Sequence, residues 1–328
     1  MGHALFTNSR PPDTAQWLPL GFRDPPTRWM RGRFDEVAFA LPEFERGAFS
    51  MAGGAHENEL LDVIATRGDE KADWARRPVA LVSKSYRLIG HREVMAGVAD
   101  SLSALGIDPG GLDTHATLDR YGAHVALEIN LPANWLVDPG DGFPLLLQLR
   151  CLNSVDGTST LRLLFAWFRL VCSNGLMAGF SEDEHRLRHR ESRRQPGIRE
   201  TIGSGLSAAS VDRHAMSRWL ERRIPPERFA PFADGALKDA WGVGDAARFL
   251  HIARTGHDAA IADRFQPGVP SAKRMHASVA VPGSPARATT EWHAAQALSW
   301  IARDRIDAAQ RLDRLLEIPR LISELSGD

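Results

Sequence analysis

The clearest pattern along the chain is an alternation of apolar and polar residues from 123 to 131. One side of this segment carries Ala123, Val125, Leu127, Ile129 and Leu131. The other side carries His124, Glu128 and Asn130. A period of two residues is typical of a β-strand with one buried face. Tyr121 and Gly122 can turn this strand back on residues 112–120, so the pattern predicts a β-hairpin.

Two further extended segments follow the hairpin. Residues 145–152 come after a turn rich in Pro and Gly, and residues 161–172 come after a turn at Asp156 and Gly157. The second segment is apolar on both sides, which is typical of a strand in the interior of a sheet. Its aromatic residues are therefore predicted to belong to the core rather than to a stacking platform for a ligand.

The end of that strand completes the predicted sheet. Asn174 and Gly175 are expected to form the closing turn. An antiparallel sheet over residues 112–172 is the firmest prediction that the pattern supports.

The region before the sheet begins irregularly and then becomes periodic. Residues 7–42 are rich in Pro and Arg but retain Trp and Leu, so they are predicted to be an arm packed on the body. Residues 56–64 are predicted to form a short helix. A strand or a bent pair of strands is expected at 79–89, and apolar residues at helical spacing predict a helix at 94–105.

Helical periodicity returns after the sheet. Helices are predicted at 211–220, 246–253, 290–303 and 306–325. Pro319 is expected to kink or divide the last helix. The Pro/Gly-rich residues 266–288 are predicted to form a surface loop. Gly203 and Gly205 lack the lysine of a phosphate-binding loop, so a hinge is expected there.

These elements predict an α+β protein. Its antiparallel β-sheet consists of a hairpin and further meander strands, is flanked by helices and precedes a mainly helical C-terminal part. The predicted divisions are a Pro/Arg-rich arm with a short helix at 1–76, the sheet core at 77–202, and a helical part packed on it at 203–328. With 328 residues and 43% hydrophobic composition, the chain is long enough to bury a sizeable core.

Composition narrows the function classes only slightly. The chain has 40 basic and 41 acidic residues, so no global field attracts it to a polyanion, and any such site must be local. Cys151 and Cys172 lie in apolar runs, which suits buried thiols in a reducing compartment. Because no signal core or membrane-spanning apolar run is found, we expect a cytoplasmic protein with no membrane partner.

One segment departs from this charge balance. Between 186 and 199 the chain carries Arg186, Arg188, Arg190, Arg193, Arg194 and Arg199, with His189 among them and only one acid. On a strand with Leu187 pointing inward, alternate arginines would share the opposite face, whereas a helix would disperse them. Such a row can neutralise successive phosphates. The alternative is a solvated surface in a chain that is generally rich in arginine.

A second candidate lies earlier in the chain. Lys84, Tyr86 and Arg87 combine two cations with one of only two tyrosines, which suits a phosphate contact beside a stacked base. The alternative is a tyrosine at the edge of the core with its hydroxyl hydrogen-bonded.

Two histidines in the arginine-rich region are candidates for a metal site. His185 and His189 stand four residues apart, which on a helix would direct both imidazoles to one metal ion. No third ligand follows from the spacing, and the alternative is two solvated or phosphate-facing histidines. No nucleophile elbow or other catalytic signature occurs. We therefore predict no catalytic residue and no cofactor.

Three segments resemble one protein family. They are "RPVALVSKSYRLIGHREVM" at Arg77–Met95, "FRLVCSNGLMAG" at Phe168–Gly179 with "RLRHR" after it, and "TTEWHAAQALSWIA" at Thr289–Ala302. In order and spacing they are similar to the phage/plasmid-related family known as domain of unknown function 932. The chain departs from the family pattern at Arg190, where threonine is usual, and at His293 and Ala294.

The resemblance implies a protein of prophages, plasmids or integrated elements, with no activity generally assigned. The predicted architecture is also distantly similar to single-strand annealing proteins of the Rad fifty-two type. We therefore expect a non-catalytic nucleic-acid-binding protein that forms a homo-oligomer and binds or anneals single-stranded DNA in recombination. The expected contacts are Lys84, Tyr86, Arg87, Arg186, Arg188, His189, Arg190, Arg193 and Arg194. The alternatives are a metal-dependent nuclease or hydrolase, and a scaffold protein of a mobile element.

Overall fold

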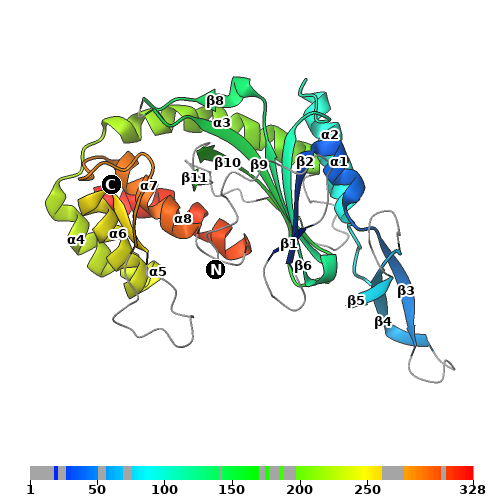
Figure 1. Ribbon diagram of the computed structural model, residues 1–328. Helices are drawn as coiled ribbons and strands as arrows, with labels where there is room; N and C mark the ends of the chain where they lie inside the picture. The colour runs from blue at the N-terminus through cyan, green and yellow to red at the C-terminus, as the bar shows by residue number, and fades with distance from the viewer. Residues whose placement is uncertain are drawn as a thin grey trace.

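The fold is that of an α+β protein, as predicted. The computed structural model describes residues 18–20, 27–50, 57–68, 76–140, 142–169, 174–176, 185–187, 197–260, 277–303 and 308–327. Figure 1 shows a large curved sheet, a smaller sheet that projects from it, and a helical C-terminal part.

The large sheet is antiparallel and has nine strands among the described residues. Its strands are β1 (Leu18–Leu20), β2 (Thr27–Arg33), β6 (Asp113–Asp119), β7 (His124–Asn130), β8 (Leu136–Val137), β9 (Leu145–Ser154), β10 (Leu161–Arg169), β11 (Asn174–Leu176) and β12 (His185–Leu187). The main order is β1-β2-β6-β7-β9-β10-β11, with β8 on β9 and β12 on β10. The hairpin of β6 and β7 and the interior position of β10 are confirmed.

One face of this sheet is buried under three helices. They are α1 (Phe34–Ala40), α2 (His91–Ala104) and α3 (Ile198–Glu221), and Figure 1 shows them along one side of the sheet. The alternation in β7 is confirmed, because Val125, Leu127 and Ile129 are all buried on this face. Helices α2 and α3 meet at Gly97, where an added Cβ would lie 2.8 Å from Ile198 Cδ1.

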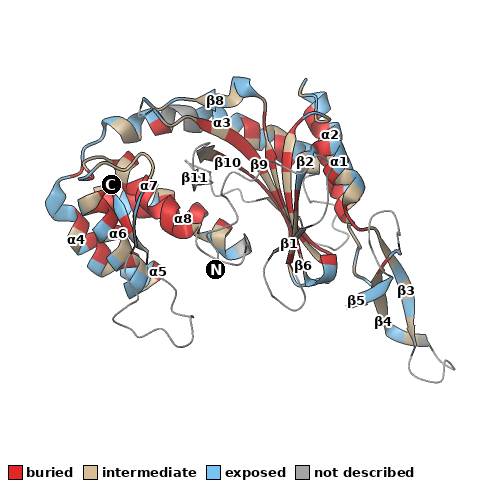
Figure 2. Ribbon diagram, viewed as in Figure 1, coloured by how far each residue is buried: buried red, intermediate tan, exposed pale blue. Residues whose placement is uncertain are grey.

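The smaller sheet projects from the body. We call this sheet the arm, and it differs from the Pro/Arg-rich arm that the sequence predicts at 1–76. It consists of β3 (Phe44–Ser50), β4 (Glu57–Thr66) and β5 (Arg77–Ser83), with β4 in the centre. Figure 2 shows mainly intermediate and exposed residues along it. At its root, Ile64 and Val82 form a small apolar cluster with Ala123 and Val155 from two turns of the large sheet.

The helix predicted at 56–64 is wrong, since residues 57–64 belong to β4. A short apolar run such as Leu60 to Ile64 fits both periods, and pairing with β3 and β5 selects the strand. The division expected after residue 76 falls between β4 and β5, which are paired in one sheet. Strand β2, from the predicted arm region, pairs with β6 of the large sheet.

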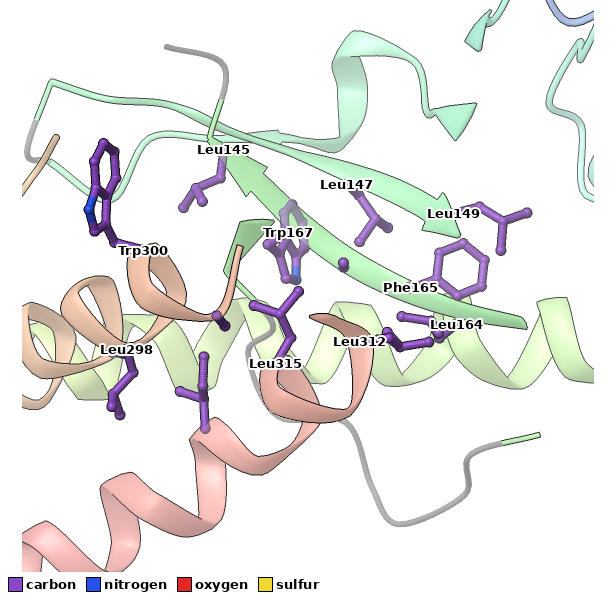
Figure 3. Packing of buried hydrophobic residues seen from close by; sticks show 14 of the residues in the cluster. Leu145, Leu147, Leu149, Leu164, Phe165, Trp167, Leu298, Trp300, Leu312 and Leu315 are labelled. Atoms are coloured by element: carbon purple, nitrogen blue, oxygen red, sulfur yellow. The ribbon is translucent and has the colours of Figure 1, made fainter. Parts of the chain in front are cut away.

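The C-terminal part is mainly helical. Its elements are η4 (Pro226–Arg228), α4 (Phe229–Phe232), η5 (Ala233–Leu237), α5 (Lys238–Trp241), α6 (Val243–Thr255), β13 (His257–Ala260), β14 (Ala277–Ala280), α7 (Glu291–Ala302) and α8 (Ala308–Ser326). Helix α7 is buried on nearly all sides. Figure 3 shows Leu298 and Trp300 of α7, Leu312 and Leu315 of α8, and Trp167 of the sheet, all of one core cluster.

Two local predictions after the sheet need correction, and of the kink or division expected at Pro319 only the division is wrong. Asn174 and Gly175 belong to β11 rather than to a turn, because they pair with Arg169 and Phe168. Pro319 lies within α8 without dividing it. Part of the predicted loop, residues 277–280, is a strand that pairs with β13.

The expected hinge at Gly203 and Gly205 is also wrong, since both glycines lie inside α3. Gly205 faces β10, where a Cβ would lie 2.4 Å from Phe165 Cδ2. The missing side chain therefore lets α3 approach the sheet closely.

Candidate nucleic-acid interface

The first residues of the arginine-rich segment form an edge strand of the large sheet. Strand β12 pairs with β10 and sets Arg186 directly opposite Arg162 and Leu187 opposite Leu161. The prediction that a row of arginines contacts phosphates requires a strand, and residues 185–187 form one. Arg188, His189, Arg190, Arg193 and Arg194 lie outside the described residues. Arg199 is exposed in the first turn of α3.

Arg46 of β3 organises the segment that contains Lys84 and Tyr86. Its guanidinium donates to the carbonyl oxygens of Ser83 (3.2 Å), Lys84 (2.7 Å) and Tyr86 (2.7 Å). It also donates to Asp62 Oδ2 at 2.6 Å. Three carbonyls of one turn are satisfied by a single side chain, which fixes the backbone from which Lys84 and Tyr86 project.

The three candidate side chains of this segment have different surroundings. Lys84 Nζ lies 4.0 Å from Asp62 Oδ1, and Arg87 Nη2 lies 3.9 Å from Glu93 Oε1. Both distances are at the outer limit for an ion pair, and Lys84 and Arg87 are exposed. Because both side chains are exposed, they can reach an anion from solvent.

Tyr86 is packed at the edge of the small apolar cluster at the root of the arm. A Cβ added at Gly157 would lie 3.5 Å from the ring carbon Cε2 of Tyr86. The hydroxyl of Tyr86 donates a hydrogen bond to Ser154 O at 3.4 Å. Burial and the nearby charge of Asp156 raise the pKa of Tyr86 to about 12. These contacts match the alternative prediction for Tyr86, a tyrosine at the edge of the core with a hydrogen-bonded hydroxyl.

Asp156 connects the two turns at this end of the large sheet. Its carboxylate accepts from Arg120 Nη1 at 3.3 Å and lies 2.8 Å from His124 Nε2. Thr158 Oγ1 donates to Asp156 Oδ1 at 2.6 Å. Burial works to raise the pKa of Asp156, but these hydrogen bonds from His124 and Thr158 outweigh it and hold the pKa well below its usual range.

This constellation does not have the geometry of a nucleophilic triad. Asp156 Oδ2 and Thr158 Oγ1 both approach the same nitrogen of His124, at 2.8 and 2.9 Å. A triad needs the carboxylate on one imidazole nitrogen and the hydroxyl on the other. The three side chains therefore act as a rigid clamp on the β9–β10 turn.

The β6–β7 turn presents the second tyrosine of the chain. Tyr121 is 40% exposed, and the guanidinium carbon of Arg77 lies 4.8 Å from its ring centroid. Arg77 is the first residue of β5, so this contact joins the arm to the large sheet. A cation over an aromatic face is attractive even at an exposed site.

The second face of the large sheet carries a continuous polar row. The register places Arg31, His115, Glu128 and Arg150 side by side across four strands. The neighbouring row has Asp113, Asn130 and Gln148, with Asn130 Nδ2 donating to Asp113 and Gln148 Nε2 donating to Asn130. We call these seven residues the polar face.

Acidic and basic groups balance on the polar face. Arg31 forms a bidentate pair with Asp113 at 2.8 and 2.7 Å. Burial works to raise the pKa of Glu128, but the charge of Arg150 and the hydrogen bond with His115 outweigh it and hold the pKa far below its usual range. With Arg31 and Arg150 balanced by Asp113 and Glu128, the polar face has no excess positive charge to attract a phosphate.

Helix α8 contributes to the same face. Asp313 accepts a hydrogen bond from Arg162 Nη2 at 2.6 Å, and Arg162 is 7% exposed. The arginine that stands opposite Arg186 is therefore held in place by the C-terminal helical part.

A metal centre has no support among the described residues. In that part of the chain no group of three or more His, Cys, Asp or Glu side chains is placed to hold a metal ion. His185 begins strand β12, whereas the spacing of four aligns two imidazoles on a helix. His189 lies outside the described residues.

Several residues of this region were not found from the sequence. Arg46, Arg77 and Arg120 are distant in sequence from the segments that they contact, and periodicity gives no signal for such long-range contacts. Tyr121 was identified only as a turn residue. Its position directly before Gly122 in the turn between two strands is the one local signal that could have singled it out.

Comparison with known families agrees with the resemblance in the three sequence segments. The model of the domain of unknown function family (DUF932) matches residues 78–314, more than half of the chain. The chain belongs to this family. No curated protein and no solved structure matches it.

The DUF932 match begins inside β5 and ends inside α8. It includes the sheet end with Tyr86, Tyr121 and Asp156, and it also includes β12. Arg46 lies outside the match, although it fixes a turn inside it. Among the described helices, none is both long and apolar enough to cross a bilayer.

Proposed function

We propose that this chain is a non-catalytic nucleic-acid-binding protein that holds a phosphate backbone at the end of the large sheet. The observation that carries the proposal is the course of β12. This strand runs from His185, opposite Leu163, to Leu187, opposite Leu161. Leu161 begins β10 directly after the turn that contains Asp156 and Thr158.

The arginine-rich segment therefore leaves β12 at the same sheet end as the Lys84 segment. Tyr86 packs on Gly157 there, and Arg120 contacts Asp156. The start of the arginine-rich segment, at Arg186, and the Lys84 segment are about a hundred residues apart along the chain, and both lie at this end of the sheet. Convergent cations on neighbouring elements are the usual footprint of a nucleic-acid site.

Local charge is what gives this site its affinity. Lys84, Arg87 and Arg120 each have a carboxylate partner nearby, so they add modest attraction. The excess positive charge comes from Arg186, Arg188, Arg190, Arg193 and Arg194. Single-stranded DNA is the proposed ligand, and a homo-oligomer in the cytoplasm is the proposed state. The link to prophages and plasmids that the family resemblance implies suits a role in recombination.

The salt dependence of binding tests this function. If about four phosphates are neutralised, the affinity for an oligonucleotide should fall with a log–log slope of about −3, or about 60-fold between about 50 and 200 mM salt. Replacing Arg188 and Arg190 by Ala should flatten the slope by about one or more. Fluorescence anisotropy of a labelled oligonucleotide measures both quantities.

A matched control removes the same number of arginines elsewhere. Arg223 and Arg254 are exposed residues of the C-terminal part, and their double replacement by Ala should leave the slope unchanged. The proposal fails if the wild-type protein does not bind any oligonucleotide at about 50 to 100 mM salt, where such contacts dominate. It also fails if both double variants behave alike.

A further inference from the structure

The β6–β7 turn has an unusual backbone. Three consecutive residues, Arg120, Tyr121 and Gly122, have φ angles of 48°, 58° and 86°. The left-handed region suits glycine and, to a lesser extent, asparagine, because a Cβ crowds the following carbonyl. Among the described residues, Arg120 and Tyr121 are the two non-glycine residues with positive φ. A strained backbone conformation costs free energy and persists only where the surrounding structure holds it, so such strain often marks a functional site.

Contacts on both sides hold this turn in place. Arg120 Nη1 pairs with Asp156, which is itself clamped by His124 and Thr158. Arg77 of the arm lies over the ring of Tyr121. Arg77 therefore holds the ring of Tyr121, and the Arg120–Asp156 pair holds the neighbouring backbone, while 40% of the Tyr121 surface stays in solvent.

The two tyrosines of the chain differ in what they can offer a ligand. Tyr86 is packed on Gly157, and its hydroxyl donates a hydrogen bond to Ser154 O. Tyr121 presents more surface and stands at the tip of a turn. A nucleobase can stack on an exposed aromatic ring, and its phosphates can then reach neighbouring arginines.

We infer that Tyr121 is a stacking site for an unpaired nucleobase, with Arg77 and Arg120 next to its phosphates. This inference rests on the proposed function and specifies its ligand, because a base inside a duplex does not expose its face. Strand β7 is separated from β12 by β9 and β10, so a spacing of about 5 Å per strand places Tyr121 roughly 14 Å from the arginine-rich edge. A single strand can span that distance across the sheet end.

Replacing Tyr121 by Asn tests the inference without straining the turn. Asn tolerates the left-handed region, so the melting temperature should stay within a few degrees of the wild type or rise. Affinity for a short oligothymidylate should fall about 5- to 100-fold. Affinity for an abasic oligonucleotide of equal length and charge should be almost the same for the variant and the wild type. Phe39→Leu, which removes an exposed aromatic ring of α1 outside the proposed site, should bind both oligonucleotides as the wild type does.

The outcomes separate this inference from the proposed function. If Tyr121→Asn binds oligothymidylate as tightly as the wild type, stacking is overturned while nucleic-acid binding stands. Stacking is also overturned if the variant loses affinity equally for both oligonucleotides, since the lost contact then involves no base. If the wild type binds neither oligonucleotide, both the function and the stacking site are rejected.

Discussion

Replacing Gly205 by Leu is expected to lower the free energy of unfolding by about 3 kcal/mol, because the new side chain would be forced into the core. An ideal Cβ at this position would lie 2.4 and 2.6 Å from two ring carbons of Phe165, which is 1% exposed. Neither the ring nor the helix can move far, since β10 is paired on both edges and α3 also contacts α2. Urea unfolding followed by circular dichroism measures the change.

Gly203 provides the matched control, two residues earlier in the same helix. No heavy atom lies within 4 Å of a Cβ added there. Gly203→Leu should therefore stabilise the protein by about 0.5 to 1 kcal/mol, since leucine favours the helix over glycine. If both variants change stability in the same direction, the close approach of α3 to the sheet is contradicted.

Glu128→Ala is expected to lower the free energy of unfolding by about 3 kcal/mol, because it leaves Arg150 and His115 on the polar face without their carboxylate partner. The side chains of Arg150 and Glu128 are only 14% and 27% exposed, so water does not fully replace the lost partner. Glu324→Ala is the control, because its pair with Arg320 is on the exposed surface of α8 and should cost less than about 0.5 kcal/mol.

The same carboxylate gives stability a dependence on pH. Its folded-state pKa is depressed, so its contribution is fully present above the unfolded value of about 4.3 and is lost as the pH falls towards the folded value. The wild type should therefore lose stability below about pH 4 more steeply than Glu128→Ala does. Equal acid sensitivity of the two proteins would contradict an ionised Glu128 in the folded state.

Much of the sheet could be predicted because its signal is local. The alternation in residues 123–131 and the doubly apolar strand at 161–169 follow directly from a period of two, and the structure has β7 and β10 there. The final helices follow from helical spacing in the same way. These patterns can be read from the sequence because the burial of one or both faces of an element determines which of its positions are apolar.

The contacts that shape the candidate site could not be predicted, because they depend on distant pairing. Residues 57–64 fit either period, and only their neighbours β3 and β5 make them a strand. Arg46 reaches the carbonyls of Ser83 to Tyr86 across the arm. The two cations of the Lys84 segment were found from the sequence, but the turn that presents them depends on a side chain about forty residues away.

The most direct test of a nucleic-acid site at the sheet end is photo-crosslinking of the full-length protein to a single-stranded oligonucleotide that carries halogenated uracils, with peptide mapping by mass spectrometry. We expect adducts at Tyr121, in residues 84–87 and in residues 186–194, and we expect high salt to suppress them. Adducts confined to the polar face or to the C-terminal helices, or a complete absence of adducts at low salt, would contradict the account.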